Sequence, residues 1–131
     1  MLRRYITWGT ALAGLAVILG AFGAHKLKEL ATPELVAGFQ TGVQYQMYHS
    51  LALILLAIAS QSSNTKFFRW SGTCFLLGIL LFSGSIYLLT AIKASEAVGV
   101  RGIGFITPIG GVFFIAGWLF FFIGSIAKPR S

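Results

Sequence analysis

The sequence predicts an all-α integral membrane protein, a bundle of four transmembrane helices joined by short loops. Its 131 residues are 56% hydrophobic and only 10% charged, whereas an ordinary soluble domain carries roughly 25% charged residues. The mean hydropathy is +0.84, and four apolar stretches reach the ~20 residues that a helix needs to cross a bilayer. Because four spans leave only short connections, we expect one membrane domain over residues 1–131.

The first predicted span covers about residues 4–24. Its two preceding arginines and its small-residue ending, Ala21 to Ala24, are also typical of a secretory signal peptide. The apolar run is longer than the roughly 7 to 15 residues of a signal core, so we interpret it as an uncleaved span. Small residues recur along one helical face at three- and four-residue intervals: Gly9, Ala13, Ala16, Gly20 and Ala24. Such a face lets a neighbouring helix pack closely.

The second predicted span covers about residues 43–60, but its helix is expected to begin earlier. Thr32, Pro33 and Glu34 form a helix start: a capping side chain, a proline at the first helical position and an acid in the first turn. A helix from there to Ala59 would be roughly 40 Å long at 1.5 Å per residue, longer than the ~30 Å hydrocarbon core. We therefore expect its first ten or so residues to lie in the headgroup region or to separate as an interfacial helical segment before the second span.

The third and fourth predicted spans cover about residues 69–92 and 107–127. Each carries small residues spaced by seven, which keeps them on one helical face. These residues are Ser71, Gly78 and Ser85 in the third span and Gly110, Gly117 and Gly124 in the fourth. Gly84 lies in a second small cluster with its neighbouring serines. We expect Gly20, Ala24, Gly84, Gly110 and Gly117 to lie at helix contacts in a left-handed bundle.

The basic residues predict the orientation of the bundle, because Lys and Arg are retained on the cytoplasmic side. One side holds six of them: Arg3, Arg4, Lys66, Arg69, Lys128 and Arg130. The other side holds four: Lys26, Lys28, Lys93 and Arg101. This bias favours cytoplasmic N- and C-termini. Basic residues in ones and twos are typical of contacts with anionic headgroups, so we expect the lipid bilayer and no nucleic acid as a partner.

Polar side chains concentrate in the first half of the second predicted helix. Most of them fall on one half of the helical circumference. His25 closes the first span on the same side of the membrane, so it could approach His49. The sequence therefore predicts an outer-leaflet pocket for a small ligand, a lipid such as a quinone, or a partner helix. Its candidate residues are His25, Gln44, Tyr45, Tyr48 and His49.

Several alternatives to this pocket stay open. Tyr and His rings also favour the membrane interface, and Gln and Ser side chains also hold helices together. Two histidines and one cysteine are too few for a protein-only zinc site, so we expect no metal and no cofactor. The two histidines would suffice as axial ligands of a haem, which leaves a quinone- or haem-associated membrane subunit as an alternative.

Transport and catalysis have weaker signals. No acidic residue lies inside a predicted span, which argues against a small proton-coupled exporter. A small transporter or channel that uses a histidine relay stays open. We expect no enzyme, because the chain has no Asp and no GxSxG motif, and Ser83–Gly84–Ser85 lacks a base. The small glycine faces are equally compatible with contacts inside one chain, with a homo-oligomer and with a membrane-protein partner.

Several segments together resemble a known family. They run from Gly20 to His25 and from Phe39 to His49, with shorter likenesses at Phe82 to Tyr87 and Thr107 to Gly111. On these segments the chain resembles the YgdD/YwdK-like family, domain of unknown function 423, which is related to the eukaryotic transmembrane protein 256 group. The resemblance implies a four-helix protein of the bacterial cytoplasmic (inner) membrane. It implies no established biochemical activity and no catalytic residue.

Overall fold

The computed structural model describes residues 3–62, 66–95 and 103–127. The described residues form helices and no strand, and four stretches are long and apolar enough to cross a bilayer. The predicted all-α fold with four membrane-spanning helices is therefore confirmed. The spans are α1 (Arg3–Ala24), α3 (Pro33–Ala59), a third span that joins α4 (Lys66–Gly78), η1 (Ile79–Ser83) and α5 (Gly84–Ala94), and α6 (Ile106–Ile126). The short helices α2 (Leu27–Leu30) and η2 (Ile103–Phe105) lie in the connections.

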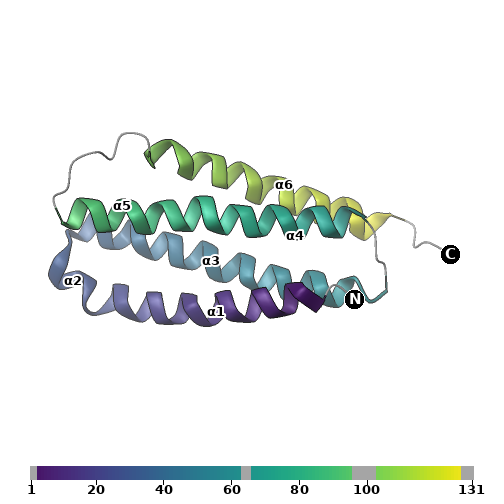
Figure 1. Ribbon diagram of the computed structural model, residues 1–131, viewed down its shortest axis with the longest axis horizontal. Coiled ribbons are helices and arrows are strands. Elements are labelled where there is room, and N and C mark those ends of the chain that lie inside the picture. The colour runs from purple at the N-terminus through teal and green to yellow at the C-terminus, as the bar shows by residue number, and fades with distance from the viewer. Residues whose placement is uncertain (1–2, 63–65, 96–102, 128–131) are drawn as a thin grey trace.

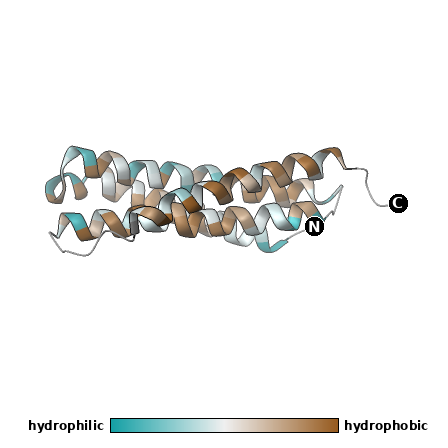
Figure 2. Cartoon of the chain, turned by 90° about the horizontal axis from the view of Figure 1, so that it is seen from above, coloured by the Kyte–Doolittle hydropathy of each residue, from teal (hydrophilic) through white to brown (hydrophobic). Residues whose placement is uncertain are grey.

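The four spans lie side by side and alternate in direction, in the order α1, α3, third span, α6 (Figure 1). The helices α1 and α6 form the two edges, and α3 and the third span form the centre. Hydrophobic residues cover most of the helix lengths (Figure 2). In its most apolar window α3 is 50% buried, against 17% for α1 and 22% for α6. The edge helices therefore leave most of their surface to lipid, whereas α3 is shielded by its neighbours.

The second span begins as predicted but does not break. The Thr32 hydroxyl accepts a hydrogen bond from the Leu35 amide at 3.3 Å, and Pro33 is at the first helical position. From there α3 continues unbroken for 27 residues, so no interfacial segment separates within its first ten residues. The Gln40 side chain explains why these turns stay on the bundle, since its Nε2 donates to the Gly20 carbonyl of α1 at 3.1 Å. In the connection between α1 and α3, the four-residue α2 is the only separate helix.

The third span departs from regular α-helical geometry at η1, a π-helical turn that the sequence pattern did not predict. Such turns occur inside α-helices and are frequent at functional sites. At its end the Ser83 hydroxyl donates to the Gly42 carbonyl of α3 at 2.7 Å. On the α6 side, Gly110 lies so close that a Cβ there would overlap the backbone nitrogen of Phe82. The π turn thus lies where the third span meets both α3 and α6.

Glycines make the closest contacts between helices. Three of the five predicted positions make such a contact, and two do not. Gly110 and Gly117 lie against the third span, and a Cβ at Gly117 would lie 2.6 Å from the Phe75 ring. A Cβ at Gly20 would lie 3.2 Å from Val43 of α3. Ala24 is exposed, because its neighbour Gly23 is the residue that faces α3. Nothing lies within 4 Å of a Cβ at Gly84, because Ser83 takes the contact with α3 instead.

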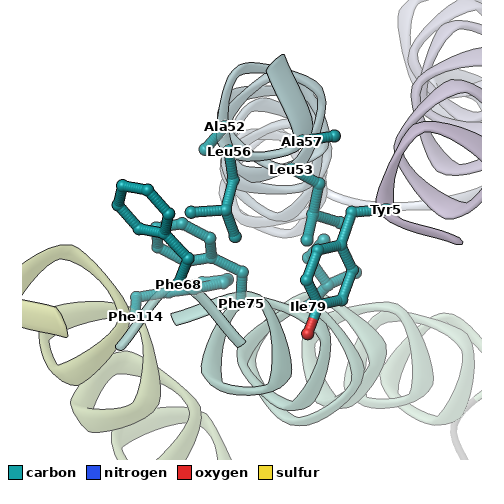
Figure 3. Close-up of a cluster of buried hydrophobic side chains, with 9 residues drawn as sticks. All are labelled: Tyr5, Ala52, Leu53, Leu56, Ala57, Phe68, Phe75, Ile79 and Phe114. Atoms are coloured by element: carbon teal, nitrogen blue, oxygen red, sulfur yellow. The ribbon is translucent and has the colours of Figure 1, made fainter. Parts of the chain in front are cut away.

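A cluster of buried side chains connects all four spans (Figure 3). It combines aromatic rings with small and branched residues of α3 and η1: Tyr5, Ala52, Leu53, Leu56, Ala57, Phe68, Phe75, Ile79 and Phe114. Hydroxyl groups add hydrogen bonds between helices, since Tyr5 donates to the Arg69 carbonyl at 2.9 Å and Ser71 donates to the Gly117 carbonyl at 2.7 Å. Packing and such bonds associate helices in lipid, where the hydrophobic effect does not.

Candidate functional site

A groove of about 650 Å³ opens between α3 and α6, and we call it the aromatic groove. Its walls carry mainly rings from α3, η1 and α6: Tyr45, Tyr48, His49, Phe82, Phe114 and Trp118. Small or branched residues of α6 complete the lining: Pro108, Gly111, Val112 and Ile115. Three of the five predicted site residues therefore lie together. The groove has the size of an ordinary ligand site, roughly 300 to 1,000 Å³.

His49 is fixed in this groove by two hydrogen bonds. Trp118 Nε1 lies 3.0 Å from His49 Nε2, and His49 Nδ1 lies 2.7 Å from the Tyr45 carbonyl oxygen. An indole N–H can only donate, so Nε2 must accept and Nδ1 must carry the proton. The Phe114 ring stacks on the imidazole with centroids 3.6 Å apart. His49 is thus a neutral imidazole with both nitrogens occupied, covered on one face.

Tyr45 and Tyr48 supply two polar groups of the groove, their phenol hydroxyls. The Tyr45 ring stacks on Phe82 at 4.7 Å and lies 5.9 Å from the Tyr48 ring. Tyr45 is 38% exposed and Tyr48 55% exposed. Within the described part of the chain, neither phenol hydroxyl has a hydrogen-bond partner. Two donors at the groove are therefore available to a ligand or to another molecule.

The other two predicted residues lie outside the groove. The His25 ring is exposed and its Nδ1 bonds to the Ala21 carbonyl at 2.8 Å, one turn earlier in α1. The His25–His49 approach does not form, because His49 is sixteen residues into an unbroken helix, roughly 24 Å along its axis. Gln44 is exposed and does not line the groove.

The contacts of the groove show how deep it reaches into the bundle. His49 contacts Phe114 and Trp118, which lie near the middle of α6. Its neighbour Gln46 bonds to the Leu12 carbonyl near the middle of α1. His49 therefore lies at mid-bundle, whereas Pro108 and Gly111 of the same groove lie in the first two turns of α6, so the groove extends from the beginning of α6 to the middle of the bundle. The outer-leaflet position stays a prediction, because it depends on which end of the bundle faces outward.

The sequence pattern missed a buried pair of polar side chains behind the groove. Gln46 is 2% exposed, and its Nε2 donates to the Leu12 carbonyl at 2.8 Å. Its Oε1 accepts from the Tyr87 hydroxyl at 2.7 Å. On a helical wheel Gln46 lies about 100° from Tyr45, away from the face that Tyr45, Tyr48 and His49 share, and this position is the sequence signal that it serves a different neighbour. Trp118 has no such signal, because its contact with His49 joins two helices and appears in no pattern within one of them.

No group of three or more His, Cys, Asp or Glu side chains that could hold a metal ion is found in residues 3–62, 66–95 and 103–127. Use of His49 as a metal or haem ligand would require its bond to Trp118 or to Tyr45 to break. The arrangement instead offers stacking surfaces and two phenol donors, which suit noncovalent binding of a flat ring.

Comparisons with known proteins show the family of the chain. The model of a family described as "Protein of unknown function (DUF423)" matches residues 19–111. The chain belongs to this family. DUF423 was also the family that the histidine segments resembled, so that expectation is confirmed. No solved structure matches the chain.

Relatives of this DUF423 chain cover it almost completely. The UPF0382 inner membrane protein YgdD of Escherichia coli K12 is 39% identical over the whole chain and 96% of its own length. A UPF0382 membrane protein of Haemophilus influenzae is 43% identical over the whole chain and 99% of its own length. The UPF0382 membrane protein SH2409 of Staphylococcus haemolyticus is 36% identical over 95% of the chain. The protein is therefore a small multi-pass membrane protein, and these names assign no activity.

Proposed function

We propose that this DUF423 chain is a bacterial inner-membrane protein that binds a lipid-soluble, ring-bearing ligand of the quinone class in the aromatic groove. The observation that carries this proposal is the pair of unpartnered phenol hydroxyls, Tyr45 and Tyr48, near the middle of a membrane-spanning bundle. Transfer of a hydroxyl from water to apolar surroundings without a hydrogen bond costs about 1–3 kcal/mol by protein mutational data. A ligand with carbonyl oxygens would supply the missing acceptors.

The walls of the groove suit the ring of such a ligand. Phe82, Phe114 and Trp118 provide ring faces and edges, and aromatic pairs prefer offset or edge-to-face contacts. The His49 imidazole is held in place by Trp118 and Phe114, so it acts as a rigid part of the wall. A rigid wall loses little side-chain entropy when a ligand binds.

The same contacts support binding over transport and over haem ligation. The polar side chains behind the groove, Gln46, Tyr87 and Ser83, are engaged with one another or with backbone carbonyls. They therefore favour a role in holding helices together instead of a relay. The engaged nitrogens of His49 likewise favour a structural role for the imidazole.

The test uses Trp118 as a reporter inside the groove. The variant Trp8→Phe/Trp70→Phe, reconstituted in lipid nanodiscs, keeps Trp118 as its only tryptophan. Addition of a short-chain benzoquinone should quench its fluorescence in a saturable way. Removal of one hydroxyl by Tyr45→Phe or Tyr48→Phe should raise Kd roughly 2- to 10-fold, since a neutral hydrogen bond contributes about 0.5–1.5 kcal/mol.

The matched control keeps Trp8 instead, through Trp70→Phe/Trp118→Phe. Trp8 lies on α1 and does not line the aromatic groove, so its fluorescence should decrease only linearly with quinone concentration in the lipid. Equal, non-saturating quenching of both reporters would contradict the proposal. Saturable quenching that both Tyr→Phe variants leave unchanged would contradict the role of the hydroxyls.

We further propose that both termini are cytoplasmic. The count of six basic residues against four supports this orientation, and both ends of the described chain lie at the same end of the bundle (Figure 1). In a Cys74→Ser background, we expect Ser62→Cys to be shielded from a membrane-impermeant maleimide applied to spheroplasts. Lys28→Cys, at the opposite end, should react. The reverse pattern would show external termini.

A further inference from the structure

A second groove lies on another face of the bundle, between α1 and the third span, and we call it the α1–α4 groove. Its volume is about 390 Å³. All of its lining side chains are hydrophobic: Trp8, Leu12, Leu76, Leu77, Ile79 and Leu80. Trp8 and Leu80 are 54% and 66% exposed, so the groove opens to the surroundings of the bundle. In a membrane these surroundings are lipid chains.

Each wall of this groove leads to an arginine at the same end of the bundle. On α1, Arg4, Trp8 and Leu12 are spaced by four residues and therefore share one helical face. On the third span, Arg69 stands seven residues before Leu76 and eight before Leu77, which places it on the face that lines the groove. The helices α1 and α4 run in the same direction, so both arginines lie at the end where these helices begin (Figure 1).

Tyr5 links the side chain of Arg4 to the backbone at Arg69. Its hydroxyl accepts from Arg4 Nη2 at 3.4 Å and donates to the Arg69 carbonyl at 2.9 Å. The Tyr5 ring lies against Gly72, where a Cβ would overlap it, and the ring is 1% exposed. The Arg4 guanidinium therefore lies beside the first turn of α4, and both Arg4 and Arg69 are themselves exposed.

Positive charge at this end has no acidic counterpart in the described residues. Arg3, Arg4, Lys66 and Arg69 all lie in the first turns of α1 and α4. The chain has three acidic residues in all. Of these, Glu29 and Glu34 belong to α2 and the first turn of α3, at the other end of the bundle, and Glu96 lies outside the described residues. The ion pair that the described residues form joins Lys26 to Glu29, also at the other end.

We propose that the α1–α4 groove is a binding site for one anionic phospholipid. Its phosphate lies between the guanidinium groups of Arg4 and Arg69, which suit the oxygens of a phosphate geometrically. One acyl chain follows the apolar walls from Trp8 toward Leu80. Leu80 is eleven residues beyond Arg69, roughly 16 Å deeper at 1.5 Å per residue. This depth is about half of the ~30 Å hydrocarbon core, which is one leaflet.

The position of Trp8 agrees with this placement. It follows Arg4 by one turn, roughly 6 Å along the helix. Tryptophan is enriched at the level between headgroups and acyl chains. The polar end and the apolar groove thus meet where the two parts of a phospholipid meet, which sets this site apart from the general attraction of basic residues to an anionic leaflet.

The experiment measures lipid retention by native mass spectrometry of the detergent-solubilised full chain. Phosphatidylglycerol and phosphatidylethanolamine of the same acyl chains are added in equal amounts. We expect one phosphatidylglycerol to be retained at least fivefold more than phosphatidylethanolamine, and Arg4→Gln/Arg69→Gln to abolish this preference. The control Lys26→Gln/Lys28→Gln removes the same charge from the other end of the bundle and should keep it.

A second variant tests the binding of the acyl chain separately from the binding of the phosphate by the arginines. Leu77→Trp fills the groove while both arginines remain, and it should lower phosphatidylglycerol retention at least threefold. Glycerol 1-phosphate, which has the headgroup chemistry without acyl chains, should not compete. Equal loss in both charge variants, retention unaffected by Leu77→Trp, or competition by glycerol 1-phosphate would each overturn the proposal.

Discussion

The contact between Gly110 and the π turn allows a sharp test of how α6 is held. A Cβ on Gly110 would overlap the Phe82 backbone nitrogen and would lie 2.7 Å from the Phe82 Cα and 2.8 Å from the Leu81 carbonyl carbon. These are backbone atoms and cannot rotate away as a side chain can. Gly110→Ala must therefore push α6 away from η1.

The next residue provides a matched control. A Cβ on Gly111 meets its nearest neighbour, the Phe82 ring, at 4.0 Å, which is ordinary contact. Both substitutions raise helix propensity by the same amount, up to about 1 kcal/mol. Overpacking of a tight contact costs about 1–3 kcal/mol. We therefore expect Gly110→Ala to be about 1–3 kcal/mol less stable than Gly111→Ala.

The assay is reversible unfolding in mixed micelles of a mild detergent and sodium dodecyl sulfate, followed by tryptophan fluorescence and circular dichroism. The difference between the two variants removes the common propensity term. Equal midpoints for Gly110→Ala and Gly111→Ala would refute the reasoning, because the close backbone approach would then contribute nothing to the stability of the bundle.

Two further predictions concern the polar contacts around the aromatic groove. Gln46→Leu should destabilise the protein by about 1–2 kcal/mol, because it removes both hydrogen bonds of the Gln46 side chain, to the Tyr87 hydroxyl and to the Leu12 carbonyl of α1. A double-mutant cycle in the same micelles should show that Tyr87→Phe costs less in the Gln46→Leu background than in the wild type. Trp118→Phe should free His49 Nε2 from its donor. The ¹⁵N resonance of Nε2 should then shift while Nδ1 stays protonated, and an unchanged spectrum would contradict the tautomer assigned above.

Much of the fold could be predicted from the sequence because membrane spans depend on length and hydropathy alone. The start of α3 could be predicted as well, since a capping threonine followed by a proline acts locally. Such signals do not require knowledge of which helices become neighbours. They leave open how the helices pack.

What the sequence could not provide was the rotation and axial position of each helix against its partners. Gly110 and Gly84 looked equivalent as small residues, yet Gly110 lies against backbone and Gly84 lies in open space. The difference arises beside the π turn, where the hydrogen-bond pattern changes and Ser83 faces α3. Regular periodicity cannot predict such a turn.

The candidate site shows the same limit. Tyr45, Tyr48 and His49 share a groove because they are close in one helix. His25 lies outside this groove, because contact between residues of two helices requires that both lie at the same height along the bundle. The Trp118 contact to His49 joins residues that are far apart in the chain, and no pattern within one helix contains it.

The central position of α3 has a consequence for how the protein enters the membrane. In its most apolar 18-residue window the mean hydropathy of α3 is 1.2, the lowest of the four spans, while the other three range from 1.7 to 2.2. A helix with that many polar groups partitions poorly into lipid by itself. Gln40 and Gln46 both bond to carbonyls of α1, the span synthesised just before it. When α3 is synthesised, the carbonyl groups that accept these hydrogen bonds are therefore already present in α1. The first two spans are thus suited to leave the insertion machinery together as a helical hairpin.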